Sequence, residues 1–270
     1  MNPKFSVLCS LYNKENPSYL DECFKSLAYQ TLPANEIVVV HDGPLTQDLY
    51  FILDKWRKVL PLRDVILTSN VGLGNALNIG LKSCKYEHIV RVDTDDVNHP
   101  NRFEIQIQYM STNSDIAACS SHVNEFESNH KNPIRTKRVP NTHRIRMFCL
   151  YRNPLNHMAV IFKKSAVLDV GGYLHLPYME DYYLWLRLIA KNYKIHNIDD
   201  ILVDARVGNG MLDRRRGINY VKSEITLLKE IYKLKLCKNI MPCIYFSLRI
   251  LSRIIPRAIF KNLYSILRNH

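Results

Sequence analysis

The sequence lacks any cysteine pattern that would indicate disulfide bonds or a zinc site. Its seven cysteines are scattered, odd in number, and include no pair with CxxC spacing. Disulfide frameworks and zinc sites need even-numbered or closely spaced sets. We therefore expect buried, reduced thiols and a cytoplasmic protein. The first 16 residues favour the same compartment, because they have neither the basic nor the long apolar segment of a secretory signal.

The chain also lacks an uncharged run long enough to cross a membrane. The stretch between Lys238 and Arg249 has 10 residues, whereas a spanning helix needs about 20. A basic groove with interleaved aromatic residues is missing too, so we expect no nucleic acid partner. With 270 residues, of which 47% are hydrophobic, the chain can form one large domain with an appendage.

The net charge of +12 is concentrated at one end of the chain. Residues 214–270 contain 13 Lys and Arg but only Glu224 and Glu230 as acids, while residues 1–213 contain 24 Lys and Arg and 23 acids. A near-neutral body with a cationic tail favours contact between the tail and an anionic surface.

The N-terminal half alternates short, β-branched apolar runs with helix-compatible segments. The predicted strands are 5–11, 36–41, 64–68 and 87–92, and the predicted helices between them are 18–30, 46–60 and 72–84. This order predicts an α/β fold with a mostly parallel, Rossmann-like, doubly wound sheet and helices on both faces. Ligands bind such sheets at the carboxyl ends of the strands. The polar segments at those ends are Ser10–Asn13, His41–Gly43, Asn70–Gly72 and Asp93–Asp96.

Three carboxylates fall within four residues in the segment Asp93–Asp96. Two such charges about 4 Å apart repel by roughly 4 kcal/mol at an effective dielectric near 20. A helix cap before Pro100 would use only one of them. Mg²⁺ or Mn²⁺ would use more, because these ions bind carboxylates and complete their shell with substrate phosphates. The segment therefore predicts a metal ion that arrives with a phosphate-bearing ligand.

Five motifs in order resemble the family 2 glycosyltransferases, which are inverting enzymes with a GT-A fold. They are "SVLCSLYNKEN", "QTLPANEIVVVHDGP", "NVGLGNALNIGL", "RVDTDDVNHPNRF" and "YMEDYYLWLRL". The segment "DARVGNGMLDRRRG" is similar to the branch that makes bacterial exopolysaccharides such as amylovoran, or O-antigen repeat units. The resemblance implies a GT-A catalytic domain at 1–217, with a nucleotide-binding half (about 1–100) and an acceptor half (about 101–217). A basic amphipathic helical tail would follow at 218–270.

The resemblance also implies a binding site for a UDP-sugar. Asp42 would accept a hydrogen bond from the uracil ring, and Asp93 and Asp95 would form the DxD motif, with Asp93 near the ribose and Asp95 on Mg²⁺ or Mn²⁺. The other residues of this site would be Ser10, Leu11, Tyr12, Asn13, Gly72, Asn75, Thr94 and Asp96. Many enzymes of this fold add a late histidine to the metal, but none lies between His196 and His270.

By the same resemblance Asp181 would be the general base, with Glu180 beside it. Candidate contacts to the acceptor or its pyrophosphate are His157, Trp185 and Arg206. Each assignment has a plainer alternative. Asp181 could be only a helix cap, Asp42 a turn residue, His157 a structural histidine and Trp185 a core residue. Arg206 could belong to a solvated basic run with Arg214, Arg215 and Arg216.

The tail has two stripes at helical spacing. The apolar stripe is Ile244, Leu248, Leu251, Ile255, Ile259, Leu263 and Leu267, and the basic stripe is Arg249, Arg253, Arg257 and Lys261. Such a pattern predicts a helix that lies on an anionic membrane surface. The alternative is a helix packed on the body of the protein.

With these features, the resemblance implies a metal-dependent, inverting hexosyltransferase of surface polysaccharide biosynthesis. It would move a sugar from a UDP-sugar to a hydroxyl of a lipid-diphosphate-linked saccharide, peripherally on the inner face of the cytoplasmic membrane. One alternative is a non-catalytic nucleotide-sugar-binding protein with the same fold. Another is a nucleotidyltransferase, although "SLYNKENP" is not the Gly-rich, lysine-containing loop expected after the first strand of such an enzyme.

Overall fold

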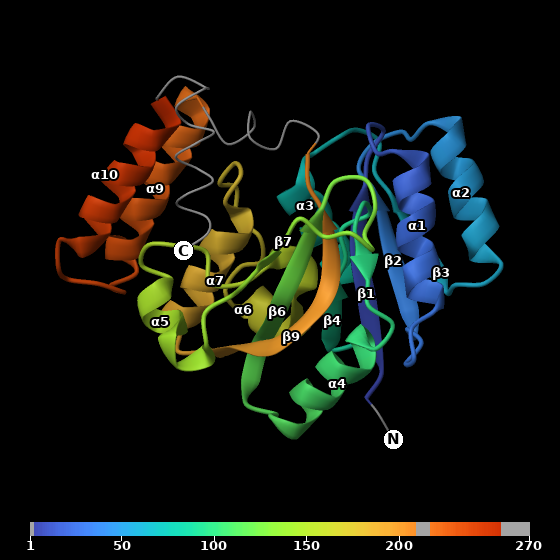
Figure 1. Ribbon diagram of the computed structural model, residues 1–270, viewed down its shortest axis with the longest axis horizontal. Coiled ribbons are helices and arrows are strands. Elements are labelled where there is room, and N and C mark those ends of the chain that lie inside the picture. The colour runs from blue at the N-terminus through green and yellow to red at the C-terminus, as the bar shows by residue number, and fades with distance from the viewer. Residues whose placement is uncertain (1–2, 209–216, 255–270) are drawn as a thin grey trace.

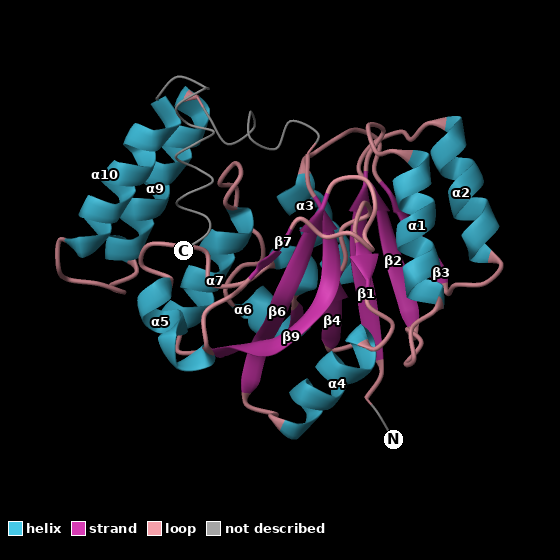
Figure 2. Ribbon diagram, viewed as in Figure 1, coloured by secondary structure: helices cyan, strands magenta, loops and turns pink. Residues whose placement is uncertain are grey.

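The computed structural model describes residues 3–208 and 217–254. Within them a nine-stranded mixed sheet is ordered β3-β2-β1-β4-β8-β6-β9-β5, with β7 paired to β6 (Figures 1 and 2). The strands are β1 (Phe5–Leu11), β2 (Glu36–His41), β3 (Leu62–Ile66), β4 (His88–Arg91), β5 (Val97–Asn98), β6 (Ile116–Phe126), β7 (Arg135–Lys137), β8 (Ile161–Lys163) and β9 (Lys194–Arg206). The helices are α1 (Pro17–Ala28), α2 (Gln47–Arg57), α3 (Leu73–Ser83), α4 (Arg102–Thr112), α5 (Ile145–Phe148), α6 (Lys164–Asp169), α7 (Glu180–Ala190), α9 (Ile218–Lys233) and α10 (Met241–Ile254). Two 3₁₀ turns, η1 (Thr142–Arg144) and η2 (His157–Ala159), complete the elements.

The doubly wound half of the prediction is confirmed. Strand β1 pairs in parallel with β2 and β4, and β2 pairs in parallel with β3. Alternate strand residues point to opposite faces: Val7 and Val39 pack with helices α1, α2 and α4, while Leu8 and Val38 pack with α3 and α7. Because β1, β2 and β4 run in the same direction, the loops that follow them lie at one edge of the sheet.

The second half makes the sheet mixed. Strand β8 is antiparallel to both β4 and β6, whereas the 13-residue strand β9 runs parallel to β6. The pairing of β6 with β9 continues to Phe126 and Arg206. This long pair brings the end of β9 beside the segment Asp93–Asp96, because the two-residue strand β5 pairs with Asp204 and Val203.

Helices α9 and α10 form a hairpin that packs on the body beside α7 (Figure 1). Leu227, Ile231 and Phe246 are fully buried in the same hydrophobic cluster as α7. The described part of the tail is therefore attached to the rest of the protein through a shared core.

The outward basic stripe predicted for the tail is wrong at its first two positions. Arg249 donates to Glu224 Oε1 at 2.9 Å and to the carbonyl oxygen of Tyr151 at 2.8 Å. Arg253 lies 3.8 Å from the same carboxylate, which is fully buried. The carboxylate attracts both guanidinium groups inward. Arg257 and Lys261 lie outside the described residues.

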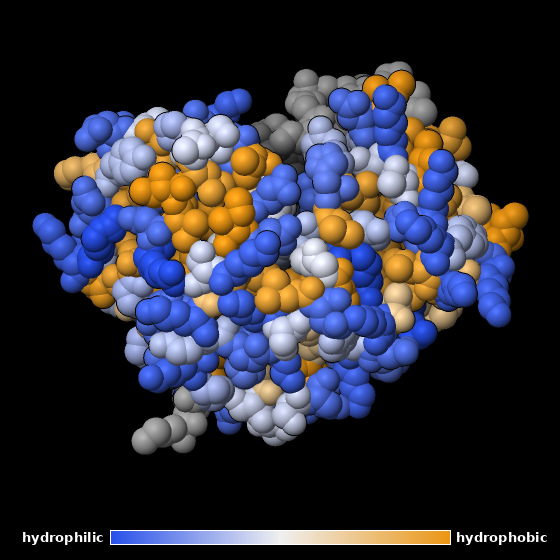
Figure 3. Space-filling model, turned by 180° about the vertical axis from the view of Figure 1, so that it is seen from behind, coloured by the Kyte–Doolittle hydropathy of each residue, from blue (hydrophilic) through white to orange (hydrophobic). Residues whose placement is uncertain are grey.

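The first three residues of the apolar stripe, Ile244, Leu248 and Leu251, are exposed, and the other four lie outside the described residues. The exposed apolar residues of α10 and of the turn before it are Ile240, Met241, Ile244, Tyr245, Leu248 and Leu251. None of the helices in residues 3–208 and 217–254 is both long and apolar enough to cross a membrane. The hairpin is not the only apolar surface, because the back of the molecule also shows apolar areas between hydrophilic ones (Figure 3), and Leu73 and Ile79 of α3 are exposed.

Candidate active site

Asp93 follows β4 and is held by a buried arginine of that strand. Arg91, which is 1% exposed, forms an ion pair with Asp93 Oδ1. Burial by itself raises the pKa of Asp93, but Arg91 together with His157 and Arg102 outweighs it, so the pKa lies below its usual value. Asp93 is therefore a fixed, ionised carboxylate. One of its oxygens is already used, which limits how much of it a metal ion can take.

Asp95 is the acid of this segment that fits a metal ligand best. Its side chain is partly exposed, and burial together with the charges of Asp93 and Glu15 raises its pKa to about 7. Neighbouring carboxylates whose mutual repulsion raises a pKa in this way are stabilised when a cation binds between them. Asp96, by contrast, is 4% exposed and accepts a hydrogen bond from the backbone N–H of Arg206 at 2.7 Å.

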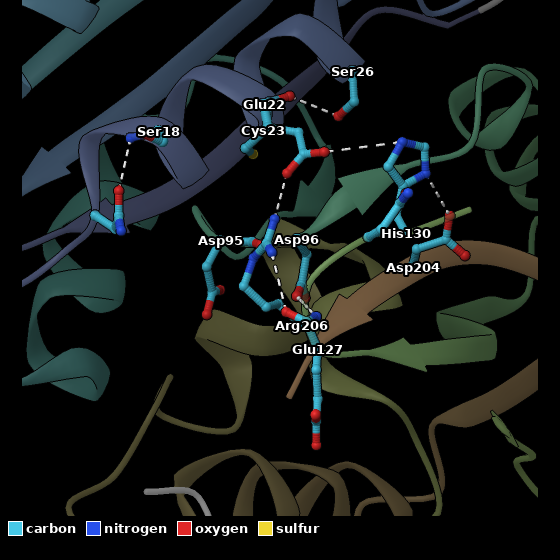
Figure 4. A network of polar contacts seen from close by, with 12 residues as sticks. Ser18, Glu22, Cys23, Ser26, Asp95, Asp96, Glu127, His130, Asp204 and Arg206 are labelled. Carbon is cyan, nitrogen blue, oxygen red and sulfur yellow. Dashed lines mark hydrogen bonds and ion pairs between the residues drawn. The ribbon is translucent and has the colours of Figure 1, made fainter. Parts of the chain in front are cut away.

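Arg206 holds the segment Asp93–Asp96 in place through contacts with Asp95 and Asp96. Its Nε donates to the carbonyl oxygen of Asp95 at 3.1 Å, and its Nη2 is paired with Glu22 of α1 (Figure 4). The guanidinium lies between the rings of Tyr19 and Phe126, 3.8 and 4.5 Å from their centroids. The side chain is only 4% exposed. The solvated alternative for Arg206 is therefore wrong, and its donors are used to position Asp95 and Asp96 rather than left open toward a pyrophosphate.

Asp42 joins the loop after β2 to the start of α3. It is 4% exposed, and its Oδ1 accepts from the backbone N–H of Val71 at 2.7 Å while Oδ2 accepts from Asn70 at 3.0 Å. Each oxygen keeps a second lone pair for a ligand. Gly43 allows this close approach: its φ is +87°, and a Cβ there would lie 2.8 Å from the backbone nitrogen of Asn70.

The loop after β1 meets the acidic segment through Glu15. Thr94 donates its hydroxyl to Glu15 Oε2 at 2.6 Å. Of the predicted residues here, Ser10 and Leu11 are the last two residues of β1, partly buried and buried, while Tyr12 and Asn13 are exposed in the loop. Glu15 was not predicted as a site residue. Its contact with Thr94 joins two loops that are far apart in the chain, and such a contact leaves no local pattern in the sequence.

Asp181 stands in the first turn of α7. Its Oδ2 accepts from Asn153 Nδ2 at 2.6 Å. The cap-only alternative is wrong, because the N-cap of α7 is Met179, which makes no side-chain cap bond. Glu180 is partly buried, and burial raises its pKa. Asn153 is a second residue that the sequence did not reveal.

His157 and Tyr173 lie within the electrostatic reach of both Asp93 and Asp181. His157 Nε2 lies 3.0 Å from the Tyr173 hydroxyl. Burial, followed by the charge of Arg91, lowers the pKa of His157 to about 4, so the ring is neutral near pH 7. The charges of both Asp93 and Asp181 act on His157. Trp185 is fully buried and packs edge-on against His157, so it is a core residue and the contact predicted with the acceptor is wrong.

A small pocket of about 90 Å³ joins the start of α3 to the start of α7. Its walls are Val71, Gly72, Leu73, Gly74, Asn75, Tyr173, His175 and Glu180. Asn75 is exposed and donates to the carbonyl oxygen of Val71 at 3.0 Å. Val71 thus links Asp42 to the pocket, and Glu180 links the pocket to Asp181, so these residues form one rim. That Asp93 and Asp95 belong to the same site stays a prediction.

Asp93 and Asp95 can hold a divalent cation only if a bound substrate supplies further oxygen ligands. Among the described residues, no group of three or more His, Cys, Asp and Glu side chains is arranged to hold a metal ion. Mg²⁺ and Mn²⁺ commonly bind through one or two carboxylates plus substrate phosphates. Asp95, with the fixed Asp93 beside it, fits that smaller requirement.

Comparisons with known proteins identify the family of the chain. The family model described as "Glycosyl transferase family 2" matches residues 6–168. The amylovoran biosynthesis glycosyltransferase AmsE of Erwinia amylovora is 43% identical over 261 residues, which cover 96% of this chain and 97% of that protein. The UDP-Gal:α-D-GlcNAc-diphosphoundecaprenol β-1,3-galactosyltransferase of Escherichia coli is 38% identical over 257 residues, with 95% and 92% coverage.

Solved structures share the fold. The structure of S. aureus TarS 1–349 in complex with UDP-GlcNAc superposes with a TM-score of 0.67 at 20% identity and covers 93% of this chain and 72% of that one. The mannosyltransferase PcManGT from Pyrobaculum calidifontis, in complex with GDP-Man and Mn²⁺, gives a TM-score of 0.62 at 16% identity, with 100% and 81% coverage. The fold is thus the GT-A fold. By the match of the family model and the two close relatives, the chain belongs to glycosyltransferase family 2.

Proposed function

We propose that this glycosyltransferase moves a sugar from a UDP-sugar to a hydroxyl of a lipid-diphosphate-linked saccharide during surface polysaccharide biosynthesis. The observation that supports it best is the rim from Asp42 to Asp181, together with His157, on which the charges of both Asp93 and Asp181 act. The printed name of the Escherichia coli relative, a galactosyltransferase that uses UDP-Gal and a diphosphoundecaprenol acceptor, supports the two substrate classes.

In this proposal Asp42 and the residues around Gly72 hold the uracil nucleotide, and Asp95 holds Mg²⁺ or Mn²⁺ beside its diphosphate. The ion would supply Lewis-acid stabilisation of the departing diphosphate. Arg91 keeps Asp93 ionised, and Arg206 fixes the backbone of Asp95.

Asp181 accepts the proton of the acceptor hydroxyl as its oxygen attacks the anomeric carbon, and the bond from that carbon to UDP breaks in the same displacement. One displacement inverts the anomeric centre, so an α-linked donor gives a β-linked product. A placed base typically contributes 10²–10⁴-fold to the rate. Asn153 donates to Asp181 Oδ2 and so orients the carboxylate.

The α9–α10 hairpin is the proposed contact with the membrane. Its exposed residues Ile244, Leu248 and Leu251 lie on one face of α10. The exposed lysines of the hairpin and its turn are Lys222, Lys229, Lys233, Lys235 and Lys238. Apolar residues flanked by lysines suit an anionic leaflet, so we place the enzyme peripherally on the cytoplasmic face.

The test is UDP release from a panel of UDP-sugars, with the lipid-linked acceptor and with Mn²⁺ or a chelator. We expect release with at least one sugar, stimulated by acceptor and lost with chelator. Binding of UDP-sugars without any turnover would instead favour the non-catalytic alternative.

A further inference from the structure

A cavity of about 460 Å³ lies between the 175–178 loop and helix α9. Its walls are His175, Leu176, Pro177, Tyr178, Asn219, Lys222, Ser223 and Thr226. It shares His175 with the small pocket that contains Glu180, and the charge of His175 acts on Glu180. A ligand in this cavity would therefore contact His175, which also lines the pocket that contains Glu180 of α7. Its volume falls in the range of ordinary ligand sites, roughly 300–1,000 Å³.

The walls combine an aromatic ring, a cation and several hydrogen-bonding groups. Tyr178 is 50% exposed, and its ring lies against Tyr220 with centroids 5.4 Å apart. Its φ of +68° is in the left-handed region, which bulky residues adopt at a cost and often at functional sites. The Asn219 amide and the Thr226 hydroxyl add polar groups beside it. An exposed aromatic face with neighbouring amide and hydroxyl groups suits a sugar ring.

Lys222 supplies the charge. It is exposed, and none of the described carboxylates lies within ion-pairing distance of it. On helix α9 it lies one turn from Ile218 and one turn from Ile225, which are 73% and 40% exposed. A cation that lines the cavity and lies between two exposed apolar residues suits a ligand that has a sugar, a phosphate and a lipid in that order.

We propose that this cavity is the acceptor subsite, with the lipid-linked sugar against Tyr178 and the acceptor diphosphate at Lys222. The lipid then continues along the apolar face of the α9–α10 hairpin, and the sugar hydroxyl points toward Asp181. This inference rests on the proposed function and specifies which surface takes its second substrate.

The test compares Lys222→Gln with Lys229→Gln, an exposed lysine of α9 that does not line the cavity. Transfer is measured in a neutral detergent, so that no anionic phospholipid competes, with two acceptors: the lipid-diphosphate saccharide and the same saccharide without the diphosphate. Lys222→Gln should raise the KM for the first acceptor about tenfold, through loss of a charge-assisted contact. The KM for the second acceptor and for the UDP-sugar should stay unchanged, as should all values for Lys229→Gln.

Tyr178→Ala should raise the KM for both acceptors and leave acceptor-independent donor hydrolysis intact. If the wild-type protein transfers sugar but Lys222→Gln behaves like Lys229→Gln, the subsite is refuted while the proposed function stands. A wild-type protein that transfers no sugar to either acceptor would overturn both. Because Lys222 is exposed, unfolding midpoints that match the wild type will show that an altered KM is not a folding defect.

Discussion

Replacing Asp181 with asparagine removes the proposed base and changes little else. Asn153 donates to Asp181 Oδ2 at 2.6 Å, and an asparagine oxygen can accept the same bond. The change costs the difference between a charged and a neutral hydrogen bond, about 1 kcal/mol. It also removes an acid from the first turn of α7, worth about 0.3–1 kcal/mol. The free energy of unfolding should therefore fall by no more than about 2 kcal/mol.

The effect on transfer should be much larger. Loss of a placed base lowers kcat by about 10²–10⁴-fold, equivalent to about 2.7–5.4 kcal/mol in the barrier. The assay is transfer to the lipid-linked acceptor under saturating donor, with UDP and Mn²⁺ binding measured by calorimetry. Binding should stay within about twofold of the wild type, because Asp42 and Asp95 are untouched.

Glu180→Gln is the matched control, since Glu180 is the neighbouring acid on the same turn and lines the small pocket. It should keep more activity than Asp181→Asn. Near-normal turnover of Asp181→Asn would refute the assignment of the base. A larger loss in Glu180→Gln would transfer that role to Glu180.

Four further predictions test the surroundings of the site. Arg206→Lys should weaken activation by Mn²⁺ about 10- to 100-fold, because it removes the bond that fixes the Asp95 backbone. Arg249→Ala should lower the free energy of unfolding by about 3–5 kcal/mol in urea titrations, because it leaves a carboxylate of α9 buried without its main partner. Leu248→Gln combined with Leu251→Gln should reduce sedimentation with anionic vesicles at least about tenfold while donor hydrolysis persists. Burial, together with Arg91, lowers the pKa of His157 from 6.5 to about 4, so the unfolded chain binds more protons in that interval. Stability should fall by about 2 kcal/mol as pH drops from about 7.5 to about 5, and His157→Gln should lack this component.

The parallel half of the fold could be predicted because its strands are short, continuous apolar runs. The predicted bounds of β1 and β2 agree with the structure, and β3 lies two residues earlier than the predicted 64–68. Strand β9 was not predicted. Its sequence, "KIHNIDDILVDAR", interrupts the apolar pattern with Asp199 and Asp200, and its pairing with β6 contains register shifts. A strand held by long-range pairing despite a polar middle has no local signature.

The acids of the site could be predicted because their chemistry is visible in the sequence. Their partners could not. Arg91 lies two residues before Asp93, yet nothing local shows that its side chain turns toward that acid. Glu15 and Asn153 contact residues 79 and 28 positions away in the chain. For the tail, the helical period was visible in the sequence. The sequence did not show that the buried carboxylate of Glu224 draws Arg249 and Arg253 inward.

The most direct test of the central claim is a crystal structure of the protein with UDP and Mn²⁺. The account predicts the uracil ring at Asp42, the ion on Asp95 and the diphosphate, and Asp181 facing the open side of the diphosphate across the rim. Nucleotide bound at another surface, or Mn²⁺ held by residues other than Asp95 and its neighbours, would contradict it.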